Sequence, residues 1–267
     1  MNKIIIKIIF IYNVYFFVLL MNRVLSRVFC KSSLRITFSS VRTVQRRYYC
    51  DNEIEPKTSK NRAIEILTKR ANEGDIESQV FLGDYYSNEN IIHEKAAEYY
   101  RLASINKHPV ALHKLAVCYL QGHGVELDTD KAIQLLELGM LLRYPPAFIE
   151  IGICYQKGIG VQQDLTKAFQ CFEEASKQNH PEGFRQLALC YIHGYSVPID
   201  NHKASLYLHK ASDLGDKESQ YLLGLWYYNG KGVEKDIPQA INYFTKAAEQ
   251  HHEKAKEVLE LCKNIVL

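Results

Sequence analysis

Small residues recur at a fixed spacing along most of this chain, and this spacing constrains the fold more than any other feature. Five alanines lie 36 residues apart, and a second small residue follows each of the first four after 20 residues. The first set is Ala96, Ala132, Ala168, Ala204 and Ala240, and the second is Ala116, Gly152, Ala188 and Gly224. The same step of 20 joins Ala63 to Gly83, so the pattern begins with a half repeat. A repeat of this length predicts stacked supersecondary units rather than one closed core.

Each unit reads as two helices joined by a turn. In the unit around Gly152, Cys154 belongs to the apolar face of a first helix. Gly158 ends that helix, because glycine adopts left-handed dihedrals without a Cβ penalty. Asp164 precedes the second helix, where a carboxylate accepts unpaired backbone N–H bonds. The second helix then packs through a stripe that includes Phe172. A tyrosine also follows each small residue of the first helices by three positions: Tyr86, Tyr119, Tyr155, Tyr191 and Tyr227.

Together these features resemble the Sel1-like repeat, a relative of the tetratricopeptide repeat (TPR). The small residue with its tyrosine, the GxGV turn, the Asp cap and the KAA segment all occur between Gly224 and Ala248. The resemblance implies an all-α fold, a right-handed α-solenoid of paired antiparallel helices with the first helices lining the concave side. We therefore expect helices and no strand pairing from about Asn61 onward. In the fourth repeat, Ser196 replaces the second glycine of the turn.

The repeat pattern and the composition divide the chain into three parts. Residues 1–50 are expected to be a targeting leader, and residues 51–60 a linker. Residues 61–267 are expected to form the solenoid, with a half repeat at 61–75, five repeats to about residue 252 and a capping helix at 253–266. Capping elements are needed because each repeat of a solenoid is stabilised only by its neighbours.

The leader differs in charge from the rest of the chain. Residues 1–50 hold nine of the 33 Lys and Arg and no Asp or Glu, which leaves 24 basic against 30 acidic side chains in the remainder. Residues 21–50 are rich in Arg and Ser and amphipathic if helical, which is typical of a mitochondrial presequence. The hydrophobic run at 4–20 fits a secretory signal or a membrane anchor instead. Met21 is an alternative start of translation. We expect mitochondrial localisation, with the endoplasmic reticulum and secretory pathway as the alternative and with possible membrane association through residues 4–20.

No motif for catalysis, a cofactor or a metal occurs. The segments typical of serine hydrolases, zinc proteases and phosphate-binding loops are missing from the sequence. The ten histidines include His202 and His209 on one helix face, but no third ligand accompanies them. The acidic repeat region has no basic stripe to neutralise phosphates, so nucleic acid is not expected as a partner. We therefore expect a non-enzymatic protein without cofactors.

Seven cysteines are present, and three of them follow the repeat. Cys118, Cys154 and Cys190 lie 36 residues apart, and no CxxC pair occurs. Equivalent positions on neighbouring helices lie about 8–10 Å apart, which is too far for a disulfide. We expect these thiols to be free and buried.

The resemblance to tetratricopeptide repeats implies which side chains would face a concave groove. These are the first-helix positions three before, and four and five after, the small residue. The candidates for partner binding are His113, Gln121, Ile149, Gln156, Arg185, His193, Tyr221, Tyr228 and Asn229. Arg185 and Tyr221 share one position in consecutive repeats, so we expect them to anchor one partner segment without supporting the helix core.

The predicted function is that of a mitochondrial adaptor or scaffold that binds a client protein in this groove, in stress signalling or complex assembly. The combination of a leader with Sel1-like repeats is also similar to mitochondrial members of the death ligand signal enhancer type. The alternative is a Sel1-type adaptor for protein quality control in the endoplasmic reticulum or secretory pathway. The client and the oligomeric state are open at this point.

Overall fold

The fold is all-α, as predicted. The computed structural model describes residues 56–88 and 91–266, and the side chains of 61–88 and 91–260. These residues form twelve helices and no strand. The helices are α3 (Pro56–Asn72), α4 (Ile76–Asn88), α5 (His93–Ile105), α6 (Pro109–Gln121), α7 (Thr129–Leu141), α8 (Pro145–Lys157), α9 (Leu165–Lys177), α10 (Pro181–His193), α11 (Asn201–Asp213), α12 (Lys217–Asn229), α13 (Ile237–Glu249) and α14 (Glu253–Val266).

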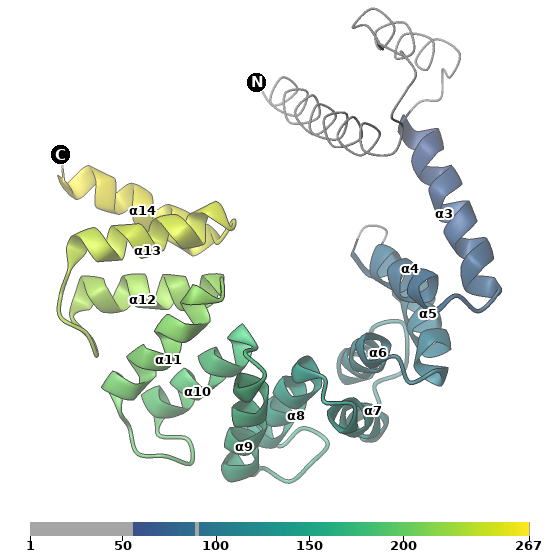
Figure 1. Cartoon of the computed structure of the whole chain (residues 1–267), viewed down its shortest axis with the longest axis horizontal. Coiled ribbons are helices and arrows are strands. Elements are labelled where there is room, and N and C mark those ends of the chain that lie inside the picture. The colour runs from purple at the N-terminus through teal and green to yellow at the C-terminus, as the bar shows by residue number, and fades with distance from the viewer. Residues whose placement is uncertain (1–55, 89–90, 267) are drawn as a thin grey trace, which may run out of the picture. The chain divides into compact units, whose positions relative to one another are not determined.

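The helices pair in the order that the repeat predicts. The chain divides between Lys60 and Asn61, and the solenoid occupies Asn61–Leu267. There, α4, α6, α8, α10 and α12 are first helices, and each packs against the second helix that follows it. Successive pairs lie side by side in a curved row (Figure 1). The first helices α8 and α10 also contact one another directly, as expected if first helices form the inner layer of the curve. The result is an α-solenoid.

The two ends of the row are single helices. α14 follows the last pair as a first helix, and it carries Glu260 at the position where the complete first helices have Gly or Ala. α3 precedes α4 as a second helix. It begins at Pro56, inside the segment expected to be a linker. Proline fits the first turn of a helix, because its missing N–H would have no helical partner there.

The helix ends follow the predicted capping chemistry. Asp164 accepts hydrogen bonds from the backbone N–H groups of Thr166 and Lys167 at the start of α9. Asp128, Asp200 and Asp236 cap α7, α11 and α13 in the same way. Gly158 ends α8 in the left-handed conformation, with φ of 72°. The predicted caps are therefore confirmed at both ends of the helix pairs.

A ring or a leucine of each second helix covers the small residue of its first helix. Phe172 lies against Gly152, so a Cβ added at Gly152 would stand only 2.5 Å from the Phe172 ring. The covering side chains are almost completely buried; they are Tyr100, Leu136, Phe172, Leu208 and Phe244. The rings face glycine, at Gly83, Gly152 and Gly224. The leucines share a cluster with alanine, at Ala116 and Ala188.

The tyrosines of the first helices meet a lysine of the second helix in four repeats. Lys131 Nζ lies 5.6 Å from the centroid of the Tyr119 ring. The equivalent pairs are Lys95 with Tyr86, Lys167 with Tyr155 and Lys203 with Tyr191. In the fifth repeat Gln239 takes the lysine position, and Tyr227 instead has its hydroxyl 3.1 Å from His209 Nε2. The first four tyrosines thus join the two helices of their own repeats, whereas Tyr227 contacts the second helix of the preceding repeat.

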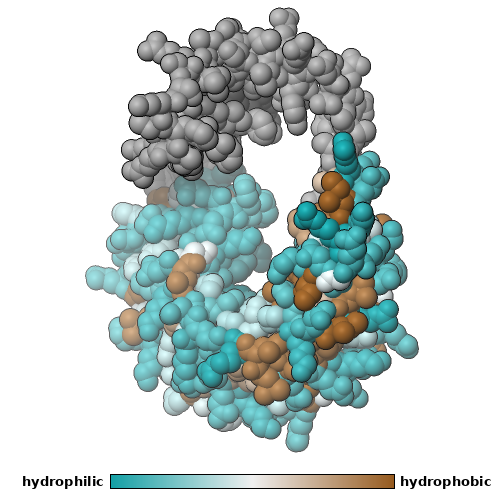
Figure 2. All heavy atoms as spheres, turned by 45° about the vertical axis from the view of Figure 1, so that its right-hand side comes forward, coloured by the Kyte–Doolittle hydropathy of each residue, from teal (hydrophilic) through white to brown (hydrophobic). Residues whose placement is uncertain are grey.

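The surface of the row is mostly hydrophilic, with separate apolar patches on the face that Figure 2 shows. Large apolar side chains are exposed at several helix ends and turns; they include Ile91, Ile105, Leu127, Leu141 and Ile199. Among the described residues, no helix is long and apolar enough to cross a membrane. The hydrophobic run at 4–20 lies outside the described residues.

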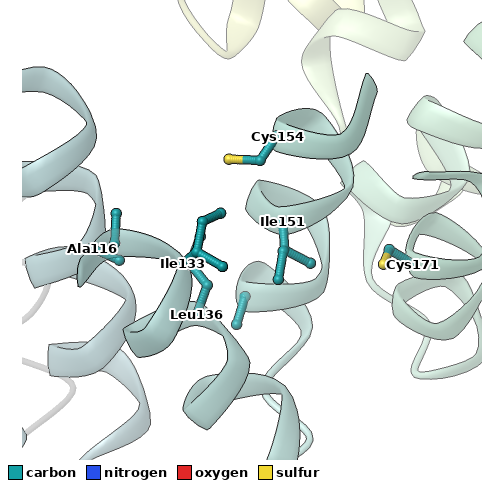
Figure 3. Packing of buried hydrophobic residues seen from close by; sticks show 8 residues of the cluster. Ala116, Ile133, Leu136, Ile151, Cys154 and Cys171 are labelled. Atoms are coloured by element: carbon teal, nitrogen blue, oxygen red, sulfur yellow. The ribbon is translucent and has the colours of Figure 1, made fainter. Parts of the chain in front are cut away.

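Small clusters between adjacent pairs take the place of one closed core. Figure 3 shows such a cluster, with Ala116 of α6, Ile133 and Leu136 of α7, Ile151 and Cys154 of α8 and Cys171 of α9. Cys118 and Cys190 are buried in the equivalent neighbouring clusters. All four of these cysteines are free thiols, as predicted for the three that follow the repeat.

Candidate binding surface

The first helices present one face to the core and the opposite face away from it. In α6 the buried positions include Leu112, Leu115 and Ala116. With 3.6 residues per turn, Val117 lies at the centre of the opposite face. His113 and Gln121 lie on either side of Val117, one turn away along the helix. The predicted groove positions therefore border this face.

The prediction for one site residue is wrong. Ile149 was expected to face a partner, but its side chain is only 2% exposed. It packs with Phe148 of α8 and Ala175 of α9 in a core cluster. Position alone did not show this, because the burial of Ile149 depends on contacts with Ala175 of α9 and Met140 of α7, which lie far from it in the sequence.

The row that contains His113, Arg185 and Tyr221 joins consecutive repeats. His113 Nε2 lies 3.9 Å from Glu150 Oε1 of the next first helix, and its ring meets the edge of Tyr144. These contacts occupy the side of α6 that faces α8. His113 is 15% exposed in its side chain, so little of it is accessible to a partner.

Arg185 is held by two carboxylates. Its Nη2 donates to Glu182 Oε1 at 2.6 Å, and its Nε lies 3.3 Å from Asp216 Oδ2 at the start of α12. Asp216 also caps α12 by accepting from the backbone N–H of Ser219. The guanidinium is 20% exposed and already paired, so it links α10 to α12.

Tyr221 has a similar role at the last interface. Its ring stacks on His252 with centroids 4.5 Å apart and lies 6.0 Å from Phe244. His252 Nδ1 accepts from the backbone N–H of Ala255, and its Nε2 lies 3.2 Å from Glu218. The expectation that Arg185 and Tyr221 do not support the helix packing is therefore wrong.

The second row of predicted residues is more accessible. Gln121, His193, Tyr228 and Asn229 are exposed, and Gln156 is half-buried. Asn229 Nδ2 donates to Leu225 O at 2.9 Å, and His193 stacks on Tyr195. These side chains lie at the C-terminal ends of the first helices, where a partner could reach them.

Sequence reasoning missed a row of apolar residues directly after the small positions. The row comprises Val117, Ile153, Leu189 and Leu225, which are spaced by 36 residues and half-buried. Val117 lies on the face of its helix that is directed away from the buried positions, whereas Ile153 and Leu225 also pack against the edges of core clusters. The signal was present in the sequence, because each precedes Cys118, Cys154, Cys190 or Trp226 in the repeat.

Several charged groups near this surface form pairs. Lys114 Nζ lies 3.4 Å from Asp84 Oδ1, and Glu150 faces His113. Burial lowers the pKa of His180, and Arg185 and His113 add to this effect, while Glu182 and Asp216 oppose it. Within the described residues, no group of three or more His, Cys, Asp or Glu is placed to hold a metal ion.

Comparison with known proteins identifies the repeat. The model of the Sel1 repeat matches five segments: residues 76–108, 109–139, 147–180, 185–216 and 217–252. These segments make up more than half of the chain. No curated protein matches it.

Solved structures share the fold. A Sel1 repeat protein from Oxalobacter formigenes is 28% identical with a TM-score of 0.65, over 75% of this chain and 59% of that one. A protective antigen present in uropathogenic Escherichia coli strains, with an SLR fold, is 26% identical with a TM-score of 0.61, over 80% of this chain and 46% of that one. This chain thus matches less than two thirds of either protein. A sel1 repeat protein from Klebsiella pneumoniae, 20% identical with a TM-score of 0.52 over 75% of this chain and 99% of that one, supports the fold alone.

Proposed function

We propose that this chain, which belongs to the Sel1 repeat family, is a non-catalytic adaptor that binds a segment of a client protein along the inner face of its first helices. Sel1 repeat proteins generally serve as scaffolds for protein–protein interactions. The observation that carries the proposal for this chain is the row formed by Val117, Ile153, Leu189 and Leu225, which stays only half-buried although every member is apolar.

The composition of this inner face suits a peptide or helix. The apolar row offers contacts to hydrophobic side chains, as in other helix-in-groove complexes. Next to it lie Gln121, Lys157, His193 and Asn229, all exposed and able to hydrogen-bond. An apolar centre with a polar border is the usual arrangement of a protein interface.

Site-specific photo-crosslinking in cells tests this proposal directly. A photoreactive phenylalanine analogue is placed at Gln121 or His193 on the inner face. The matched control positions are Gln134 and Gln170, which are equally exposed but lie on second helices. We expect the same adduct of discrete mass from both inner positions and none from the controls. Adducts from Gln134 and Gln170 alone would show that partners bind the outer layer, and would contradict the proposal.

The localisation is a separate proposal, supported by the sequence of the leader. We infer that residues 21–50 direct the protein to mitochondria, where it would act in stress signalling or complex assembly. The nine basic and no acidic side chains of residues 1–50 support this inference. The leader lies outside the described residues. A reporter fused to residues 21–60 should reach mitochondria and be shortened. Delivery of a reporter with residues 1–60 to the secretory pathway would favour an adaptor of the endoplasmic reticulum instead.

A further inference from the structure

The helix α3 is a second helix that no described first helix covers. Its residue Ala63 precedes Gly83 by the same 20 residues that separate Ala96 from Ala116. Gln79 Nε2 donates to Ala71 O at the α3–α4 turn, as Gln220 does to Ser212 O at the α11–α12 turn. The turn between α3 and α4 is therefore built like the turn between α11 and α12.

The exposed face of α3 includes two positions, those of Ala63 and Leu67, that are buried in every complete pair. The five alanines equivalent to Ala63 are at most 2% exposed, and the five side chains equivalent to Leu67 are at most 1% exposed. In α3, by contrast, Ala63 is exposed, Ile64 and Leu67 are half-buried and Ile66 is 51% exposed. Among the α3 side chains that the structure describes, from residue 61 onward, only Ala71, beside α4, is fully buried. The face is thus shaped for a first helix.

The helix pairs within this chain indicate which kind of helix can pack on the exposed face of α3. A ring on a second helix faces glycine, and a leucine shares its cluster with alanine, as Leu136 does with Ala116. Leu67 is therefore suited to a helix with an alanine opposite it. The chain's own terminal first helix, α14, does not meet this requirement, because Glu260 replaces the small residue.

The charge of α3 restricts the occupant further. Lys57, Lys60, Arg62, Lys69 and Arg70 make the helix strongly basic, with Glu65 as its one acidic residue. Arg70 lies three residues after Leu67, so it shares the face of Leu67. Two copies of α3 would repel each other, whereas a helix that places a carboxylate near Arg70 would be attracted.

We propose that α3 is a second docking surface, distinct from the inner face, which receives an acidic amphipathic helix of a partner protein with alanine at its centre. Ala63, Ile64 and Leu67 contact the apolar side of this helix, and Arg70 contacts a carboxylate of it. The partner completes the half repeat and thereby extends the solenoid by one first helix.

The test uses the full-length chain and a stapled helical peptide as the probe. The peptide has the sequence of Pro109–Gln121, with His113 and Lys114 replaced by Glu and Cys118 by Ala. We expect saturable binding, measured by fluorescence anisotropy, that weakens as salt is raised. Leu67→Glu in the protein, or Ala116→Leu in the peptide, should weaken binding at least about tenfold. Ile105→Glu, a control at an apolar side chain that is 73% exposed on α5, should not.

Three outcomes would overturn the proposal. They are unchanged binding to Leu67→Glu protein with native helix content, equal binding of the peptide that keeps His113 and Lys114, and absence of binding to the full chain. Self-association of the chain that Leu67→Glu abolishes would show that a second copy covers the face, and would also overturn the choice of partner.

Discussion

The ring of Phe172 fills the space that a side chain at Gly152 would need. The Cε1 atom of Phe172 would stand 2.5 Å from a Cβ at that position. The chain therefore has two versions of one contact, with a ring facing glycine in three repeats and leucine beside alanine in two. The two positions compensate each other, as expected where close packing leaves no room for an extra methyl group.

This compensation predicts coupling between the two positions. Gly152→Ala alone should destabilise the protein by about 1–3 kcal/mol, because the added methyl group overpacks the site. Phe172→Leu alone should also destabilise it, by about 1–2 kcal/mol, because it leaves a cavity. The double variant reproduces the pair of Ala116 and Leu136, so it should be more stable than the sum of the two losses predicts. Urea denaturation of the four proteins measures the coupling.

The control for this cycle joins residues of different pairs. Gly152→Ala combined with Leu136→Ala should show a much smaller coupling, because Leu136 does not cover Gly152. Equal coupling in both cycles would mean that the apparent compensation reflects a general loss of stability, and the pairing rule would be wrong.

The aspartate caps predict a loss of stability that depends on which side chain replaces the aspartate. Asp164→Ala removes the acceptor for two backbone N–H groups of α9 and should destabilise the protein by about 1 kcal/mol. Asp164→Asn should change stability little, because asparagine caps helices equally well. A loss with Asn as large as that with Ala would show that the ion pair with Lys167, 3.9 Å away, matters more than the cap.

The fold could be predicted from the sequence because its determinants are local and repeated. The step of 36 residues defined the helix pairs, Gly158 and Asp164 marked helix ends, and Cys154 lay on the buried face as expected. The sequence also contained the correlation between an aromatic residue on the second helix and a glycine on the first helix of the same repeat. It became interpretable only when the structure showed that Phe172 covers Gly152.

The binding surface was harder to predict, because it depends on the angle between consecutive repeats. That angle decides which side of each first helix the next repeat covers. It places His252 against Tyr221. Positions assigned by analogy with tetratricopeptide repeats therefore included residues that join repeats. The row of Val117 and Ile153 was missed, because apolar residues in a repeat suggest core before surface.

The corrected role of Tyr221 gives a direct prediction. Tyr221→Ala should lower stability by about 1–2 kcal/mol, because it removes stacking on His252 and contact with Phe244 beside α14. Tyr228→Ala, at a tyrosine that is 39% exposed, should change stability by less than about 0.5 kcal/mol. Thermal unfolding followed by circular dichroism compares the two. Equal stability of both variants would restore Tyr221 as a candidate for partner binding.

The buried thiols should be unreactive in the folded protein. Burial raises the pKa of Cys154 and Cys171 to about 11 and that of Cys190 to about 12. Since the thiolate is the nucleophile, iodoacetamide at pH 7.5 should leave these residues unmodified until the repeats open. Mass spectrometry after unfolding without reductant should find each of them free. Rapid modification of Cys190 under native conditions, or a protected pair, would contradict the structure.

The two half-buried histidines with lowered pKa predict a loss of stability in mild acid. Burial lowers the pKa of His180 and of His209, and Asp213 opposes the shift at His209. The unfolded chain then binds protons more readily than the folded chain does. The contribution of these two histidines to the free energy of unfolding is therefore fully present above the pKa of histidine in the unfolded chain, about 6.5. It falls as pH decreases below that value, until the folded pKa is reached.

Urea midpoints measured from pH 7.5 to pH 5 check this prediction. The midpoint should fall as pH decreases below about 6.5. His209→Gln should make the fall shallower, because glutamine can still meet the Tyr227 hydroxyl but takes up no proton. His251→Gln is the control, since His251 is exposed in the turn before α14 and has no such burial. An equal fall in His209→Gln and the unaltered protein would place the acid sensitivity at other groups and would contradict the prediction.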